Sequence, residues 1–239
     1  MKAQILTSLL AAAAVLGTAQ AQTLDLDYNL GGNGGAGSFG NTRTFEDDGV
    51  TLSATAWGYT FGSNDNAFQD AAVGRWGTGL GVIDRNEGIP NYDNLEHQVD
   101  NAGPDNFILF TFDTPVDIES VVIDPYNSWD RDVSYWVGNV DPNLDLTGET
   151  YADLAGLGFG SRMDDYSNNS GDARTVSVNQ SNVNAILFGA RIQETTTTEY
   201  IDAFKISKVS ASVDTIPEPS SALLGLVGAS ALFLRRRRA

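Results

Sequence analysis

The residues best suited to bind a ligand gather in one acidic stretch near the middle of the chain. Residues 92–101 read Tyr-Asp-Asn-Leu-Glu-His-Gln-Val-Asp-Asn, and Asp105 and Asn106 follow closely. Carboxylate, amide and backbone carbonyl oxygens are the ligands that Ca²⁺ collects, about six to eight at a time. The spacing of an EF-hand loop is absent. The stretch therefore predicts an irregular calcium site, and the alternative is a solvated acidic loop held by Asx turns.

The predicted calcium ligands come from this stretch and from one distant strand. The first three are Glu96, Asp100 and Asp105, joined by Asp93 from the same loop or by Asp202 near the last strand. We expect the ion to be structural rather than catalytic. The chain has no cysteine and one histidine, which excludes thiolate zinc sites, cysteine-ligated iron–sulfur clusters, thiol catalysis and multi-histidine zinc sites.

The single histidine, His97, follows Glu96 directly, and a carboxylate can orient a histidine as a general base. Nucleophilic hydrolysis with His97 as the base would need a serine placed beside it, and the chain contains no G-x-S-x-G elbow. A hydrogen-bonded structural histidine is the alternative. Paired carboxylates are needed for glycoside hydrolysis, but with 31 acidic residues their abundance is no argument for it.

Aromatic side chains in a turn offer a second kind of site. Trp129 and Tyr126 lie in the segment Pro-Tyr-Asn-Ser-Trp-Asp-Arg-Asp, residues 125–132, where an exposed ring could stack on a sugar. Trp136 alternates with polar residues in an expected strand and is assigned to the core. Packing rather than binding is the alternative for each tryptophan.

The elements that must position these residues are short strands. Val50 to Phe61 alternates with period two, which places Leu52, Ala54 and Ala56 on one face and the hydroxyls of Thr51, Ser53 and Thr55 on the other. Phe107–Phe112 and Val116–Ile123 are expected to form a hairpin-like pair around Asp113-Thr114-Pro115. Further strands are expected at 23–28, 133–137, 175–178, 185–192 and 200–210, short strands or turns at 71–76 and 80–83, and one helical turn at 151–155. The pattern predicts an all-β fold, a single jelly-roll-like β-sandwich.

Both ends of the chain have the composition of targeting segments. Lys2, an apolar run from Ile5 to Leu16, and Ala19-Gln20-Ala21 predict a secretory signal peptide cleaved between Ala21 and Gln22. At the other end an uncharged apolar run, 220–234, is short for a membrane span. We therefore expect a signal helix at 1–21, one β domain at 22–215, and a hydrophobic C-terminal helix within 216–239.

The C-terminal segment resembles the PEP-CTERM sorting signal of exported bacterial proteins. The resemblance is carried by a rigid tripeptide, the apolar run and a basic cluster, namely Pro217, Glu218, Pro219 and Arg235, Arg236, Arg237, Arg238. It implies that a membrane-embedded exosortase reads and cleaves the segment after the general secretion machinery has exported the chain. The body is also similar to an ectodomain of such proteins at residues 79–82, 96–101, 107–112 and 130–138. That second resemblance implies location and architecture, and no catalytic residue. An ordinary tail anchor or a frayed apolar C-terminus is the alternative for this segment.

The charge balance limits the partners. The chain has 31 acidic and 14 basic residues, a net charge of −17, and removal of both ends would make it more acidic. Nucleic acid and anionic membrane surfaces need clustered lysine and arginine, so neither is expected as a partner of the body. We expect a non-enzymatic exported protein of the cell envelope, cell surface or extracellular matrix, with a structural Ca²⁺ and binding to extracellular polysaccharide. The alternatives are a polysaccharide hydrolase or lyase, and a purely structural matrix component.

Overall fold

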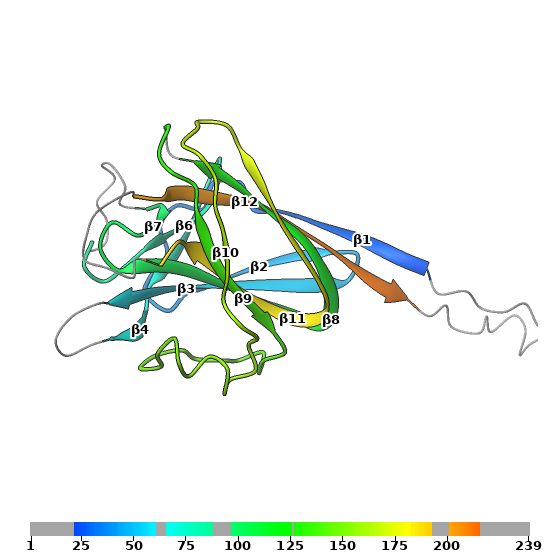
Figure 1. Ribbon diagram of the computed structural model, residues 1–239. Helices are drawn as coiled ribbons and strands as arrows, with labels where there is room; N and C mark the ends of the chain where they lie inside the picture. The colour runs from blue at the N-terminus through cyan, green and yellow to red at the C-terminus, as the bar shows by residue number, and fades with distance from the viewer. Residues whose placement is uncertain (1–21, 61–65, 88–96, 126, 193–200, 216–239) are drawn as a thin grey trace, which may run out of the picture. The chain divides into compact units, whose positions relative to one another are not determined.

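The computed structural model describes residues 22–60, 66–87, 97–125, 127–192 and 201–215. The chain divides into two units, and the larger, Asp25–Val213, holds nearly all of these residues. The described residues form a large antiparallel β-sheet and contain no helix (Figure 1). The all-β prediction is therefore confirmed. The signal helix and the hydrophobic C-terminal helix were predicted for residues outside the described ranges.

The structure describes twelve strands. Four of them are long or lie at the centre of the sheet: β3 (Val50–Thr60), β8 (Asp105–Pro125), β11 (Arg174–Ala190) and β12 (Ala203–Thr215). The others are shorter: β1 (Gln22–Asn29), β2 (Thr42–Asp47), β4 (Ala67–Asp70), β5 (Ala72–Trp76), β6 (Gly79–Ile83), β7 (Val99–Asp100), β9 (Val133–Gly138) and β10 (Met163–Asp165).

The sheet branches at β8. One path runs in the order β10-β9-β11-β8-β12-β6-β5. The first part of β8, up to Phe112, pairs with β3 on one edge, and β3 in turn pairs with β2 and β4. The later part, from Asp117 onward, pairs on that edge with β12 instead, while β11 accompanies β8 along both parts (Figure 1).

The predicted hairpin at 107–123 is wrong, because β8 is one continuous strand through Asp113-Thr114-Pro115. Proline has no N–H to donate and interrupts a ladder rather than ending a strand. The register of β11 against β8 shifts here, from Val183 opposite Val116 to Ala185 opposite Thr111. The irregularity is therefore absorbed as a bulge in the pairing, where the sequence signal of a turn was expected.

Most other predicted strands are confirmed within a few residues. The two strands predicted at 175–178 and 185–192 are one strand, β11, because register shifts carry the pairing across residues 178–184. The strands β4, β7 and β10 were not predicted. The helical turn predicted at 151–155 is wrong, since residues 150–158 form consecutive turns that do not continue as a helix.

The predicted alternation of β3 is confirmed, and it divides the strand into two faces. Leu52, Ala54 and Ala56 are buried, whereas Ser53 and Thr55 are partly exposed. On the face of Ser53 and Thr55, the connection between β9 and β10 covers one end of the sheet. The resulting core cluster joins sheet residues to that connection: Trp57, Tyr59, Phe68, Phe107, Leu109, Trp136, Ala185, Leu187 and Ile192 with Val140, Leu146, Leu154 and Phe159.

Tyr151, in the middle of the covering connection, fastens it to the sheet. Its ring stacks on Tyr59 at 3.7 Å between centroids and on Trp136 at 5.5 Å, and its hydroxyl donates to Asp105 Oδ2 at 3.0 Å. Burial, followed by the charge of Asp105, raises the pKa of Tyr151 well above its usual value, so the phenol stays protonated and able to donate. The covering connection is thus held by both ring packing and a directional hydrogen bond.

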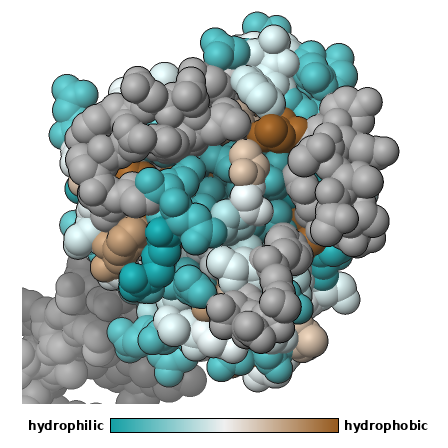
Figure 2. Space-filling view, turned by 90° about the vertical axis from the view of Figure 1, so that its left-hand side faces the viewer, coloured by the Kyte–Doolittle hydropathy of each residue, from teal (hydrophilic) through white to brown (hydrophobic). Residues whose placement is uncertain are grey.

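The surface seen in Figure 2 is mostly hydrophilic, with hydrophobic residues scattered between polar ones. In the part of the chain that the structure describes, no helix is long and apolar enough to cross a membrane.

Truncation of the core cluster should destabilise the fold strongly. Leu187, which is fully buried in that cluster, should cost about 2–5 kcal/mol of unfolding free energy when replaced by alanine, because the truncation leaves a cavity. Tyr166→Ala is the control, since this ring is 59% exposed and its loss should cost about 1 kcal/mol or less. Urea unfolding followed by tryptophan fluorescence measures both. Equal effects of the two substitutions would contradict the assignment of the core.

Candidate metal centre

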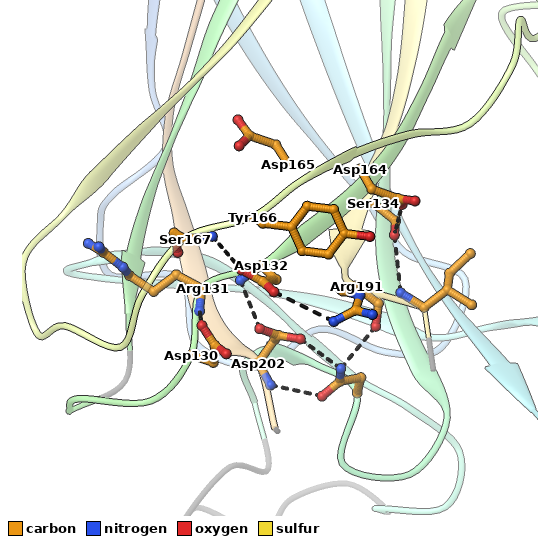
Figure 3. Close-up of polar contacts among 12 residues, drawn as sticks. Asp130, Arg131, Asp132, Ser134, Asp164, Asp165, Tyr166, Ser167, Arg191 and Asp202 are labelled. Atoms are coloured by element: carbon orange, nitrogen blue, oxygen red, sulfur yellow. Dashed lines mark hydrogen bonds and ion pairs between the residues drawn. The ribbon is translucent and has the colours of Figure 1, made fainter. Parts of the chain in front are cut away.

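Three buried carboxylates meet beside the start of β12. Asp130 and Asp132 lie in the connection between β8 and β9, and Asp202 lies directly before β12. One carboxylate oxygen of each lies within 4.8 Å of the corresponding oxygen of the others (Figure 3). Within the described residues, this is the group of three acidic or metal-ligating side chains close enough to hold one ion. We call it the aspartate triad.

Backbone pairing brings the two segments together although they are 70 residues apart. Asp130 and Asp202 form an isolated parallel β-bridge, in which the N–H of Ala203 donates to the carbonyl of Asp130 at 3.3 Å. The N–H of Asp132 donates to Asp202 Oδ1 at 2.8 Å. Because Asp130 and Asp132 are two residues apart in extended chain, both are presented toward Asp202.

Asn101 fixes the orientation of Asp202. Its Nδ2 donates to Asp202 Oδ2 and to the carbonyl of Arg191, both at 2.9 Å. In return the N–H of Asp202 donates to Asn101 Oδ1 at 2.9 Å. With both carboxylate oxygens accepting one hydrogen bond, Asp202 has one defined rotamer toward the triad (Figure 3).

The segment after β10 closes the other side of the triad. The N–H of Ser167 donates to Asp132 Oδ1 at 2.6 Å, and the N–H of Arg131 donates to Asp130 Oδ1 at 2.8 Å. The hydroxyl oxygen of Ser167 is shielded from solvent and has no hydrogen-bond partner among the described residues. It is a further oxygen atom beside the triad, of a kind that can coordinate a hard cation.

The positive charge around the triad is too small to neutralise its three carboxylates. Arg191 Nη1 lies 3.7 Å from Asp132 Oδ2 (Figure 3). Arg131, although it lies between the two aspartates in sequence, directs its guanidinium to the carbonyls of Asn168 and Asp172, at 3.1 and 2.8 Å. Arg174 pairs with Asp165 at 2.5 Å. Three carboxylates therefore meet with one guanidinium in contact.

Two carboxyl groups of the triad have raised pKa values, in keeping with their burial and the shortage of positive charge around them. Burial raises the pKa of Asp202 to about 8, with the charges of Asp132 and Asp130 acting in the same direction and the hydrogen bond from the Asp132 N–H opposing them. Burial also raises the pKa of Asp132. Ionisation of Asp132 and Asp202 in this buried position is therefore unfavourable unless a proton or a cation compensates for the charge.

The structure separates the predicted calcium ligands. Asp202 joins Asp130 and Asp132, which were not among the predicted ligands, whereas Asp100 and Asp105 lie elsewhere. Strand β7 pairs with β12 so that Asp100 is opposite Ala203, and neighbouring side chains alternate between faces. Asn101, and not Asp100, therefore faces Asp202. Asp93 and Glu96 lie outside the described residues.

Asp100 belongs to a second buried group, with Asp84 and Lys205. Burial, with the nearby charge of Asp84, raises the pKa of Asp100 to about 7, against a hydrogen bond from the Ala102 N–H at 2.9 Å and the charge of Lys205. Burial lowers the pKa of Lys205 to about 8, and its ammonium donates to the carbonyl of His97 at 3.3 Å. This group has two carboxylates and a lysine, so it lacks the three carboxylates that make the aspartate triad a candidate metal site.

The remaining predicted site residues have separate surroundings. The His97 ring packs 4.8 Å from the Trp76 ring, and the backbone carbonyl of His97 accepts the hydrogen bond from Lys205. Trp129 is partly buried, one residue before Asp130. Tyr126 and the residues of the sorting signal lie outside the described ranges. Trp136 is in the core, as predicted.

The signal that could have identified Asp130 and Asp132 was present in the sequence as an Asp-x-Asp pair directly before a strand. Two carboxylates at that spacing in extended chain lie on one face. The acidic residues predicted as calcium ligands have no such spacing and need not lie on one face. Comparison with known proteins adds no assignment, since no family model, curated protein or solved structure matches this chain.

The raised pKa of Asp100 predicts a pH dependence of stability. Because its pKa in the folded chain, about 7, is above the unfolded value of 3.8, the folded state binds more protons between these values. The stabilisation is present at low pH and is lost as the pH rises toward 7, by at most about 1.4 kcal/mol per pH unit. Asp100→Asn should therefore flatten the fall in unfolding free energy between pH 4.5 and 7.5, measured by urea unfolding with a chelator present.

Asp25→Asn is the matched control for that experiment, because Asp25 is an exposed aspartate of β1. It should leave the pH dependence as in the parent chain. A slope for Asp100→Asn equal to that of the parent would show that this carboxyl does not titrate as described.

Proposed function

We propose that this chain is a non-enzymatic exported β-sandwich protein whose fold is stabilised by Ca²⁺ bound at Asp130, Asp132 and Asp202. The observation that carries the metal assignment is the meeting of three buried carboxylates within 4.8 Å, with one arginine in contact. Burial of like charges at this density costs free energy that a divalent cation offsets.

The donor set favours Ca²⁺ over other metals. The triad offers oxygen atoms, the ligands of hard cations, while the chain has no cysteine and its one histidine lies outside the triad. Ca²⁺ accepts variable geometry with about six to eight ligands, whereas Mg²⁺ requires a near-octahedral shell. Three aspartates, the Ser167 hydroxyl and water could supply such a flexible shell.

A structural role fits the position of the triad better than a catalytic role. The carboxylates are buried, and each accepts a backbone hydrogen bond that holds it in place. A bound ion would connect residues 130–132 to the start of β12, two segments far apart in the chain. Such a connection stabilises the folded state, because the ion has no comparable site in the unfolded chain.

The sandwich in this proposal is supported by the branching of the sheet. Because β8 pairs with β3 along its first part and with β12 along its second, the sheet can fold on itself into two layers, as in a jelly roll. Ring contacts across the structure agree with that arrangement: Phe188 lies 6.3 Å from Phe204, and Tyr28 lies 5.8 Å from Phe112.

Export and sorting are proposed from the two terminal segments. The signal-peptide pattern before Gln22 and the resemblance of 216–239 to a PEP-CTERM signal support secretion followed by processing by an exosortase. The cell envelope, cell surface or extracellular matrix is the corresponding location, with membrane association through the C-terminal segment before processing. A polysaccharide-active enzyme and a structural matrix component are the alternatives.

Calcium should stabilise the protein through the triad. At a free Ca²⁺ concentration of about 100 times its Kd, the expected gain is about 2.7 kcal/mol, which raises the midpoint of thermal unfolding by roughly 5–10 °C for a domain of this size. Asp130→Asn and Asp202→Asn should each remove most of this gain, because a carboxylate ligand is lost. Differential scanning calorimetry, with Ca²⁺ or with a chelator, measures the gain for each variant against its own metal-free state.

The exposed Asp25→Asn serves as the control and should retain the full gain with Ca²⁺. If neither Ca²⁺ nor chelator alters the midpoint of the parent chain, the metal assignment is wrong. A gain that survives in both triad variants would place the ion elsewhere.

The sorting proposal predicts a defined change in mass. In its native host, the protein should be recovered with Gln22 as its first residue and shortened near Pro217-Glu218-Pro219. Replacement of these three residues by alanine should prevent C-terminal shortening, because the tripeptide is the part expected to be read. Intact-mass analysis of envelope and culture fractions checks this, and a full-length chain in the cytosol with both ends intact would refute it.

A further inference from the structure

A polar groove of about 450 Å³ lies on the sheet, distinct from the aspartate triad. Its floor is formed by strands β2, β3 and β8, and its wall by residues 142–147 of the covering connection. The volume lies in the range of about 300–1,000 Å³ that is usual for small-molecule sites. Hydroxyl and amide side chains line the groove at Thr42, Ser53, Thr55, Thr111, Asn143 and Thr147, together with a few apolar residues and two aspartates.

Strand register explains why hydroxyls gather there. Ser53 of β3 is opposite Thr44 of β2 on one side and Thr111 of β8 on the other. In the next cross-strand row on this face, Thr55 lies between Thr42 and Leu109. One face of the sheet thus presents two adjacent rows that contain hydroxyl groups.

The following row on the same face is aromatic, with Trp57 opposite Phe107. The covering connection buries this row, and Leu144 packs against its cluster while the neighbouring Asn143 and Thr147 stay exposed. The groove therefore lies where the covered aromatic end of the face gives way to its uncovered hydroxyl end. Trp57 joins the two, since its Nε1 donates to Thr55 Oγ1 at 3.3 Å.

The charges on the groove select against anionic ligands. Among the described residues that line it there is no lysine or arginine, and there are two aspartates. Asp70 is occupied by Arg85, with contacts of 2.8 and 2.6 Å. Hydrogen bonds from Thr147 lower the pKa of Asp145, so this carboxylate stays ionised at neutral pH. A phosphate or carboxylate ligand would meet negative charge here.

An apolar ligand is equally ill suited to this groove. Ser53 and Thr55 are partly exposed, and Thr55 Oγ1 accepts one hydrogen bond, from Trp57. Covering these two hydroxyls with hydrocarbon would leave their remaining hydrogen-bonding capacity unsatisfied. A ligand that both donates and accepts hydrogen bonds at regular intervals would satisfy them. Neutral sugars have that chemistry, and the rows of hydroxyls on β2, β3 and β8 offer alternating partners at the spacing of neighbouring strands, about 4.7–4.9 Å.

We propose that this groove binds a neutral oligosaccharide. The rigid floor of strands β2, β3 and β8 presents the hydroxyls of Ser53, Thr55 and Thr111, and the 142–147 wall supplies Asn143 and Thr147. The site differs from the aromatic turn at Tyr126 and Trp129, where the sequence placed carbohydrate binding. It involves no residue of the triad, so it goes beyond the proposed function and does not depend on the metal.

The test is isothermal titration of the full-length chain with neutral hexasaccharides of glucose, xylose and mannose, and with a hexasaccharide of galacturonic acid as the anionic comparison. Binding of at least one neutral probe and not of the anionic one is expected. The double variant Ser53→Ala/Thr111→Val removes two hydroxyls with little change of shape. It should weaken binding about tenfold, because each hydrogen bond lost contributes about two- to tenfold in Kd.

The matched control is Ser120→Ala/Thr175→Val, the same pair of changes on β8 and β11 outside the groove. It should bind the neutral probe as the parent chain does, and both variants should show the parent's midpoint of thermal unfolding within a few degrees. Should the groove variant fail to fold, the single exposed substitution Asn143→Ala, on the groove wall, replaces it and should weaken binding about threefold.

Three results would overturn the proposal: no binding of any neutral probe, preference for the anionic probe, or equal loss of binding in the groove variant and its control. Asp202→Asn, measured at a temperature where it is folded, should bind the neutral probe normally. Loss of binding in that variant alone would move the sugar site to the triad and would leave the metal proposal intact.

Discussion

The long pairing of β8 with β11, which continues across register shifts, is the constraint on which the other features of the fold depend. It runs from Phe107 opposite Gly189 to Ile123 opposite Arg174, and both flanking groups of strands are attached to it. The β2–β3 face that carries the groove is registered against its first part. The β12 strand that carries Asp202 to the triad is registered against its second part. A slip of one residue along β8 would turn every side chain to the opposite face, and would disrupt both sites together.

Two buried groups of acidic residues are attached to this pair of strands, and they differ in the positive charge that lies beside them. At Asp100 a lysine is close by, and the carboxyl titrates near neutrality. At the triad the nearest cation is an arginine 3.7 Å from one of three carboxylates. The first group has a fixed counter-charge from the chain itself, whereas the second leaves compensation to a proton or to a bound ion. A shortage of counter-charge, rather than the abundance of acid, distinguishes the triad from the rest of this acidic surface.

The sequence predicted local features better than long-range ones. The alternation in β3 correctly placed Leu52 inside and Ser53 outside, because a two-residue period is a property of the strand alone. The turn signal at Pro115 was misread, since its outcome depends on whether a neighbouring strand can bulge, which only the partner β11 decides. The residues proposed as metal ligands show the same limit. Asp202 could be selected as an acid beside a strand, but whether Asp100 or Asn101 faces it follows from the register of β7 against β12.

The course of β12 has a consequence for how the body would carry load. The strand begins beside the triad and runs along β8 from Phe204 to Ser212, after which the chain continues into the C-terminal segment. If that end is tethered to an envelope, a pull on the body acts along β12. The backbone hydrogen bonds to β8 lie perpendicular to the strand, so they would bear the force in shear and all at once rather than one after another. A cation at the far end of the same strand would then act as a mechanical fastening, at the position where sliding of β12 past its neighbour would have to begin.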